Sequence, residues 1–154
     1  MNFRAARVSD IRQMFEVRMS VKENMLMNPD LVTGEICEEY LTRRGNGWVA
    51  EINNHLIAFA IADLIDDNIW ALFVRPEFEG VGVGKRLHDI MLNWYFKRGK
   101  EKVWLNTLPG TKAEAFYRKN GWKETWRNEK GEIRFEMTVE EWKSRIPNVH
   151  HVPK

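Results

Sequence analysis

A glycine-rich junction in the middle of the chain constrains the fold more than any other feature. Residues 72–87 read LFVRPEFEGVGVGKRL: a hydrophobic strand, a proline-containing turn, three alternating glycines and then the start of a helix. A helix that starts after such a loop presents unpaired N–H groups and the positive end of its dipole. Gly80, Gly82 and Gly84 lack side chains, so the backbone can approach a bulky group closely. The junction therefore predicts a strand–loop–helix unit that binds an anion such as a pyrophosphate.

The register of these glycines excludes two other phosphate loops. A Walker A loop would need glycine at position 79 and Ser or Thr at position 86, where the chain has Glu79 and Arg86. A GxGxxG pattern that started at either of the first two glycines would need its third glycine at Lys85 or Leu87. The chain matches neither pattern.

Apolar periodicity along the chain predicts an α/β fold with the element order β-α-α-β-β-β-α-β-α-β-β. The first helix is expected to follow an N-cap at Ser9-Asp10, with Gln13 completing a capping box. Strands at 48–52, 56–63 and 69–74 are joined by short turns and predict an antiparallel meander. The other expected strands are 2–8, 102–105, 122–127 and 133–139, and the expected helices are 11–19, a segment from Thr33, 83–99 and 111–120.

Length and composition predict one folded domain. The chain has 154 residues, 44% of them hydrophobic and 30% charged, which suffices for a core without disulfides or metals. No repeat, low-complexity tract or linker interrupts residues 1–146, so we expect a single domain there and a polar tail at 147–154. Trp94, Trp104 and Trp122 are expected to face its core.

Charge and cysteine content argue against several classes of partner. The 24 basic and 22 acidic residues nearly balance, whereas nucleic-acid binders gather a basic excess on one face. The lone Cys37 can form no intramolecular disulfide, and no Cys/His cluster offers a metal site. The longest apolar run, Leu56 to Ala62, is too short to span a membrane, and the N-terminus lacks an apolar secretory segment. We therefore expect a cytoplasmic protein without nucleic-acid, metal or membrane partners.

The glycine junction resembles the pyrophosphate loop of the GCN5-related N-acetyltransferases, the GNAT family. The family loop reads Gln/Arg-x-x-Gly-x-Gly/Ala after a V-x-P strand end, and residues 79–84 match it except at Glu79. A glutamate at this position adds negative charge near a phosphate site, which should weaken binding unless the side chain points away. Lys85, Arg86 and Arg75 could offset that charge by contacting the phosphates.

A second segment, TKAEAFYRKNGWKE at residues 111–124, is similar to the family helix N-x-x-A-x-x-F/L-Y-x-k-x-G-F. Gly110 replaces the asparagine with which that helix frequently contacts the coenzyme, and Asn106 is a candidate substitute. The two motifs follow one another in the family's order. The residues that match the helix pattern are Ala113, Phe116, Tyr117, Gly121 and Trp122.

The resemblance implies both a fold and a reaction. The fold is a central mixed, mostly antiparallel sheet flanked by helices, with strands four and five splayed around acetyl-coenzyme A. The reaction is transfer of the acetyl group to a primary amine by direct attack in a ternary complex, with the coenzyme as cosubstrate. A homodimer is also implied. The coenzyme-binding residues that it implies are Leu72, Phe73, Val74, Glu79, Gly80, Val81, Gly82, Val83, Gly84, Lys85, Asn106, Phe116 and Tyr117.

Tyr117 matches the family's general acid, because a phenol is protonated at neutral pH and can give its proton to the departing thiolate. The general base is left open. The family's strand-four glutamate would fall near Trp70 or Ala71, and neither accepts a proton. A water-mediated base or an already neutral amine is compatible with the sequence. The side chains that could instead border the acceptor are Glu51, Asp63, His55 and Glu23.

The sequence does not identify the acceptor. Its balanced charge argues mildly against strongly cationic substrates, so a small amine is favoured over a peptide amine. The Met-rich segment 25–27 could shape an apolar pocket for it. The alternative is a non-catalytic module that binds acyl-coenzyme A as a sensor, which Glu79 and the missing strand-four glutamate would both suit.

Overall fold

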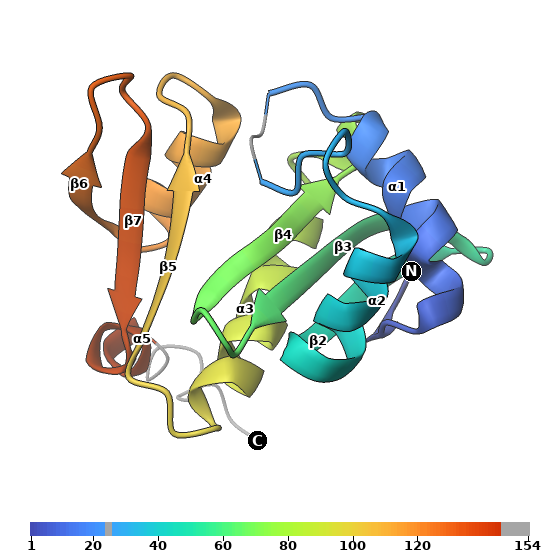
Figure 1. Cartoon of the computed structure of the whole chain (residues 1–154), viewed down its shortest axis with the longest axis horizontal. Coiled ribbons are helices and arrows are strands. Elements are labelled where there is room, and N and C mark those ends of the chain that lie inside the picture. Colours follow the sequence, from blue (N-terminus) through green and yellow to red (C-terminus); the bar gives the residue numbers. More distant parts are fainter. Residues whose placement is uncertain (24–25, 146–154) are drawn as a thin grey trace.

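The computed structural model describes residues 1–23 and 26–145 and contains one seven-stranded sheet (Figure 1). The sheet is antiparallel except for one parallel pair, β4 with β5. The mixed, mostly antiparallel sheet and the predicted element order are confirmed. The strands, in their spatial order, are β1 (Asn2–Ala5), β2 (Gly45–Ile52), β3 (His55–Asp63), β4 (Asn68–Val74), β5 (Lys102–Thr107), β7 (Ile133–Thr138) and β6 (Lys123–Arg127).

Helices cover both faces of the sheet (Figure 1). One apolar core includes Met14, Cys37 and Phe59 and lies between the sheet and the first two helices. The other core includes Leu87, Tyr95 and Phe135 and lies on the opposite face, against the third. The helices are α1 (Ile11–Met19), α2 (Gly34–Glu39), α3 (Val83–Phe96), α4 (Lys112–Lys119) and α5 (Val139–Arg145), with short helical turns at Val8–Asp10, Tyr40–Arg44 and Pro76–Phe78.

Strands β4 and β5 touch at one end and then separate. Their register contains the single pair Asn68 and Trp104, and the backbone N–H of Trp104 donates to the Asp67 carbonyl at 3.1 Å. On its other side β4 has a bulge at Trp70, because Ile61 pairs with Ala71 whereas Ala62 pairs with Ile69. A bulge bends its strand, so β4 turns away from β5 (Figure 1). The carboxyl ends of the two strands therefore lie apart, which is the splay implied by the family resemblance.

Two elements begin at this wide end of the splay. The glycine loop and α3 follow β4, and α4 follows β5. Parallel strands carry their carboxyl ends at the same edge of a sheet, so the two motifs found in the sequence meet there. The fold thus brings together segments that are far apart in the chain.

The sequence prediction missed the helix α5. Residue 139 was expected to end a strand, but β7 stops at Thr138 and α5 begins at Val139. Thr138 Oγ1 accepts from the Glu141 N–H at 3.1 Å, and the Glu141 carboxylate accepts from the Thr138 N–H at 2.9 Å. This reciprocal capping box was visible in the sequence as Thr-x-x-Glu. Trp142 then docks into the core, and the predicted tail at 147–154 lies outside the described residues.

The predicted capping box at the start of α1 is wrong. A helical turn at Val8–Asp10 precedes α1, and the Asp10 carboxylate accepts from the Arg7 N–H at 2.7 Å and from Arg4. Gln13 instead accepts from the Leu56 N–H at 2.9 Å, which fastens α1 to β3.

The three tryptophans predicted to face the core differ in their placement. Trp122 is buried, and Trp94 is half-buried with its ring edge-on to Trp48 at 5.2 Å. The prediction for Trp104 is wrong, because its β5 neighbours Val103 and Leu105 take the core face and strand alternation turns Trp104 to the other face.

Candidate active site

The loop before α3 presents open backbone. Gly80 and Gly82 have φ angles of +79° and +91°, in the left-handed region where glycine is favoured. A Cβ atom at either position would meet nothing within 4 Å, so the backbone conformation rather than crowding selects glycine. Val81 between them is 69% exposed. Gly82 is the N-cap of α3, and Val83 is its first residue, so the helix's free N–H groups face this open surface.

Gly84 joins three elements of the site. A Cβ atom there would lie 3.4 Å from Val74 Cγ2, at the end of β4, and 3.8 Å from Phe116 Cε1 on α4. The first turn of α3 therefore packs closely on both β4 and α4. Phe116 is half-buried at this junction.

The structure answers the question raised by the unusual Glu79. Lys112 Nζ lies 2.9 Å from the Glu79 carboxylate, and this hydrogen bond raises the pKa of Lys112. Lys112 is the first residue of α4, and its backbone N–H donates to Glu23 Oε1 at 3.3 Å. Three segments, the chain after α1, the glycine loop and the start of α4, therefore meet at Lys112.

The three cations proposed from the sequence have partners elsewhere. Lys85 Nζ is 2.7 Å from the Asp89 carboxylate, one helical turn further along α3. Arg75 Nε donates to the Leu56 carbonyl at 3.0 Å. The Arg86 guanidinium lies 4.3 Å from the ring centroid of Phe3. Lys112 was not among the predicted residues, although its place near the start of a predicted helix, two residues after the missing asparagine, was a usable signal.

Tyr117 is 1% exposed and lies in the core between α4 and the sheet. Its ring centroid is 5.2 Å from that of Phe116 and 5.4 Å from that of Trp122. Burial raises the pKa of its hydroxyl above the ordinary value. The phenol therefore stays protonated at neutral pH and retains a proton to donate.

His88 is a buried polar residue near Tyr117 that the sequence reasoning missed. Its Nε2 accepts from the Trp122 indole N–H at 3.0 Å, and its Nδ1 lies 2.8 Å from Asp89 Oδ1. Burial lowers the pKa of His88, so the ring is neutral with its proton on Nδ1. The available signal was its position beside Leu87 on the apolar stripe of α3.

The end of β5 carries two buried polar atoms with no hydrogen-bond partner in the described part of the chain, Asn106 Oδ1 and Thr107 Oγ1. Such atoms cost free energy unless something satisfies them. Gly110, where the family has asparagine, has a φ of +76° and donates its N–H to Glu114. Asn106 is thus a side chain with unused hydrogen-bonding capacity on the strand that borders the splay.

Two of the four candidate bases lie away from the wide end of the splay. Glu51 on β2 accepts hydrogen bonds from Arg4 and Asn2 at the β1 edge of the sheet, and Arg4 lowers its pKa. Asp63 ends β3 and pairs with Asn68, so it lies where β4 and β5 are still together. Arg44 holds its carboxylate at 2.8 Å.

The other two candidate bases lie nearer the glycine loop. His55 is exposed at the start of β3 and lines a surface groove with Gln13, Arg75 and Phe78, on the α1 side of the loop. Glu23 contacts the start of α4 through the Lys112 N–H. Of the four, Glu23 is the side chain that contacts an element bordering the splay.

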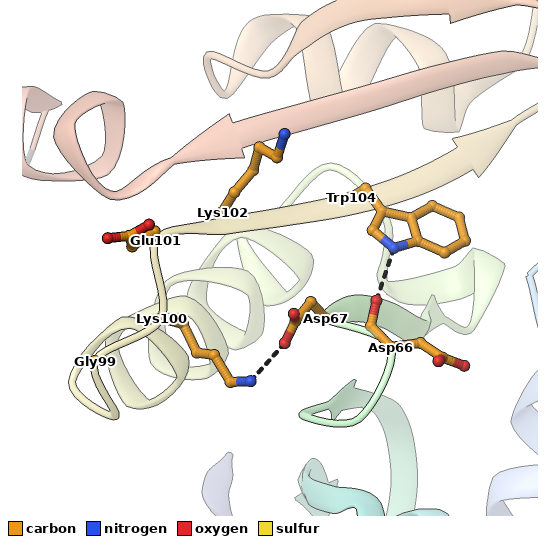
Figure 2. A pocket seen from close by; sticks show the side chains of 7 residues that line it. All are labelled: Asp66, Asp67, Gly99, Lys100, Glu101, Lys102 and Trp104. Atoms are coloured by element: carbon orange, nitrogen blue, oxygen red, sulfur yellow. Dashed lines mark hydrogen bonds and ion pairs between the residues drawn. The ribbon is translucent and has the colours of Figure 1, made fainter.

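A separate depression lies at the opposite, paired end of β4 and β5 (Figure 2). Some of its polar groups are engaged with one another: Lys100 Nζ is 2.6 Å from Asp67, and the Trp104 indole donates to the Asp66 carbonyl at 2.8 Å. It encloses about 530 Å³ and is lined by Asp66, Asp67, Gly99, Lys100, Glu101, Lys102 and Trp104. None of these residues was predicted to bind the coenzyme.

Other chemistries find little support. Within residues 1–23 and 26–145, no three His, Cys, Asp or Glu side chains gather where they could hold a metal ion. Cys37 is buried, and burial raises the pKa of its thiol to about 11, so it is a poor nucleophile at neutral pH. No helix of the described chain has the length and apolar character needed to cross a membrane.

The same fold occurs in solved acetyltransferase structures. A GNAT-family acetyltransferase from Staphylococcus aureus superimposes with a TM-score of 0.74 at 19% identity, over 90% of this chain and 98% of that one. The ribosomal-protein-S18-alanine N-acetyltransferase from Escherichia coli superimposes with a TM-score of 0.70 at 17% identity, over 90% of this chain and 93% of that one. The PaiA N-acetyltransferase from Thermoplasma acidophilum, solved with coenzyme A, superimposes with a TM-score of 0.72 at 16% identity, over 90% of this chain and 98% of that one.

The fold is thus that of the acetyltransferases. The model of the acetyltransferase (GNAT) family matches residues 9–122, from the turn before α1 to Trp122 in the second motif, and the chain belongs to this family. No curated protein sequence matches the chain.

Proposed function

We propose that the protein transfers an acetyl group from acetyl-coenzyme A to a primary amine. The observation that carries the proposal is the meeting of the glycine loop, the start of α3 and the Tyr117 helix at the wide end of the splay. The glycine loop and the start of α3 supply an anion site, and Tyr117 supplies a protonated acid. The part of β4 that has no β5 partner supplies an open strand edge.

The coenzyme would bind along one continuous path. Its pyrophosphate lies on the N–H groups of Gly80 to Gly84 and the positive end of α3. Its pantetheine runs along β4, which has no β5 partner after Asn68. Alternate peptide groups of residues 72–74 point to that unpaired side and provide hydrogen bonds. One of these N–H groups faces the thioester oxygen.

The chemistry is a direct displacement. The amine nitrogen attacks the thioester carbonyl carbon, forming the C–N bond and placing negative charge on the oxygen, which the β4 N–H stabilises. Collapse of this intermediate breaks the C–S bond, and the sulfur takes the Tyr117 hydroxyl proton. The amine's proton leaves to water or to Glu23, whose carboxylate lies at the start of α4.

We favour a small amine as the acceptor and keep a peptide amine as the second choice. The support is the nearly balanced charge of the chain. The expected apolar pocket at 25–27 gains no support, because Met27 is buried in the core between the sheet and the first two helices and residue 25 lies outside the described chain. One structural relative is named for acetylating a ribosomal-protein alanine, which makes peptides part of any acceptor screen.

The first test is calorimetric titration of the protein with acetyl-coenzyme A, followed by a thiol-release assay against a panel of small amines and N-terminal peptides. Saturable binding together with amine-dependent thiol release supports the proposal. Binding without turnover by any acceptor would favour a coenzyme-binding sensor instead. Absence of binding would remove the proposed function.

A further inference from the structure

The Lys112–Glu79 ion pair spans the two motifs that define the proposed coenzyme site. Glu79 belongs to the loop that follows β4, and Lys112 begins the helix that follows β5. Their charged atoms are 2.9 Å apart, although the residues are 33 positions apart in the chain. The pair therefore brings a lysine ammonium to the residue next to Gly80, where the pyrophosphate is expected.

The exposure of the two partners differs in a useful way. The Lys112 side chain is 78% exposed, whereas that of Glu79 is 35% exposed. An exposed ion pair contributes little stability, because water screens it and both side chains lose freedom. The lysine can thus exchange its partner at small cost, while the glutamate is the more restrained of the two.

Other cations close to the loop are less available. Lys85 is paired with Asp89, Arg75 is bonded to the Leu56 carbonyl, and Arg86 rests on Phe3. Lys112 differs from these because its anionic partner belongs to the phosphate loop itself.

We propose that Lys112 binds the pyrophosphate of the coenzyme. Before the coenzyme binds, Glu79 holds this lysine over the loop, and the pyrophosphate then replaces the Glu79 carboxylate as its partner. The inference rests on the proposed function. The pyrophosphate carries two negative charges and several acceptor oxygens, so it competes well with one carboxylate for an ammonium group. Glu79 then remains beside the phosphates without its cation and repels them, which lowers the net affinity.

The proposal predicts opposite changes in coenzyme affinity for substitutions of Lys112 and of Glu79. Lys112→Ala should weaken coenzyme A binding by roughly tenfold, the size of a lost charge-assisted hydrogen bond. Glu79→Gln should tighten binding by roughly threefold, because it removes a competitor and a repulsive charge. Lys112→Arg keeps the cation and should bind within about twofold of the wild type. Lys119→Ala, an exposed lysine at the other end of α4, is the matched control and should change nothing.

The experiment is calorimetric titration of these variants with coenzyme A and with 3′-dephospho-coenzyme A, which retains the pyrophosphate. The Lys112→Ala loss should be equal for both ligands. A loss restricted to coenzyme A would assign the lysine to the 3′-phosphate and overturn the proposal. Wild-type affinity in Lys112→Ala, or weaker binding in Glu79→Gln, would also overturn it while leaving the proposed function standing. A wild-type protein that binds neither ligand would remove both this proposal and the proposed function.

Discussion

The Trp122 indole N–H donates to Nε2 of His88 at 3.0 Å, a bond between the segment that follows α4 and the middle of α3. The indole can only donate, so this nitrogen of His88 must be unprotonated. The other ring nitrogen holds the proton and faces Asp89 at 2.8 Å. The bond therefore joins α3 to the segment that follows α4 only while His88 is neutral.

This relationship predicts acid sensitivity. Burial lowers the pKa of His88 in the folded state, while an unfolded histidine titrates near 6.5. Below that pH the unfolded chain binds a proton that the folded chain resists, so stability falls as the pH drops from about 7 to about 5.5, by at most about 1.4 kcal/mol per pH unit. Asp89 opposes the shift, whereas Lys85 and Arg145 reinforce it.

The measurement is urea unfolding at several pH values for the wild type and His88→Gln, whose amide oxygen can still accept from Trp122. The variant should lose the slope between about pH 7 and 5.5. Carboxylates titrate mostly below this window and should affect both proteins alike. Equal slopes in the two proteins would show that His88 does not carry the effect.

Tyr117→Phe should lower turnover by about 10²-fold or more, the usual contribution of a positioned general acid. The ring packs against Phe116 and Trp122, and phenylalanine keeps that packing, so coenzyme affinity and stability should hardly change. Steady-state kcat and a calorimetric Kd for coenzyme A separate the two effects. Full turnover in the variant would remove Tyr117 from its proposed role.

The sequence predicted best what local patterns determine. The glycine register gave the strand–loop–helix unit, and apolar periodicity placed β3, β4, α3 and α4 close to their observed bounds. The inner face of α3 was predicted less well: Trp94 was expected in the core and is half-buried, while the structure buries His88, Leu92 and Tyr95. The apolar residues of α3 extend around more than one side of the helix, so its packing partners decide which of them reach the core.

Long-range pairs were beyond the reach of the sequence. The Glu79–Lys112 contact joins separate motifs, and the His88–Trp122 bond links residues 34 positions apart. The local signals for Lys112 and His88 mark their places on a helix but not their partners, because a lone histidine on a helix or a lysine at a helix start has many ordinary uses. The same reason explains the spread of the candidate bases: Glu51 and Asp63 proved to have arginine partners that no local pattern indicates.

Gly82→Asp should abolish coenzyme binding and leave the fold intact. A Cβ atom at this position meets nothing within 4 Å, and aspartate tolerates the left-handed φ of +91° better than most residues, at a cost of about 1 kcal/mol. Its carboxylate would stand beside the start of α3, where the pyrophosphate is expected. Gly82→Asn, with nearly the same shape and no charge, is the matched control and should retain partial binding. Equal affinities for coenzyme A in the two variants would indicate that shape, not charge, matters there.

Arg44→Met should destabilise the protein without changing the proposed reaction. Asp63 is fully buried, and Arg44 neutralises it at 2.8 Å, at the paired end of β4 and β5. Removal of one member of such a pair leaves an uncompensated charge and costs about 3–5 kcal/mol. Adding Asp63→Asn should recover much of the loss, because the amide oxygen can still accept from the Ile65 N–H. Urea unfolding measures both changes, and kcat per folded molecule should be unaltered in the double variant. A large fall in kcat in Asp63→Asn alone would instead return Asp63 to the candidates for the general base.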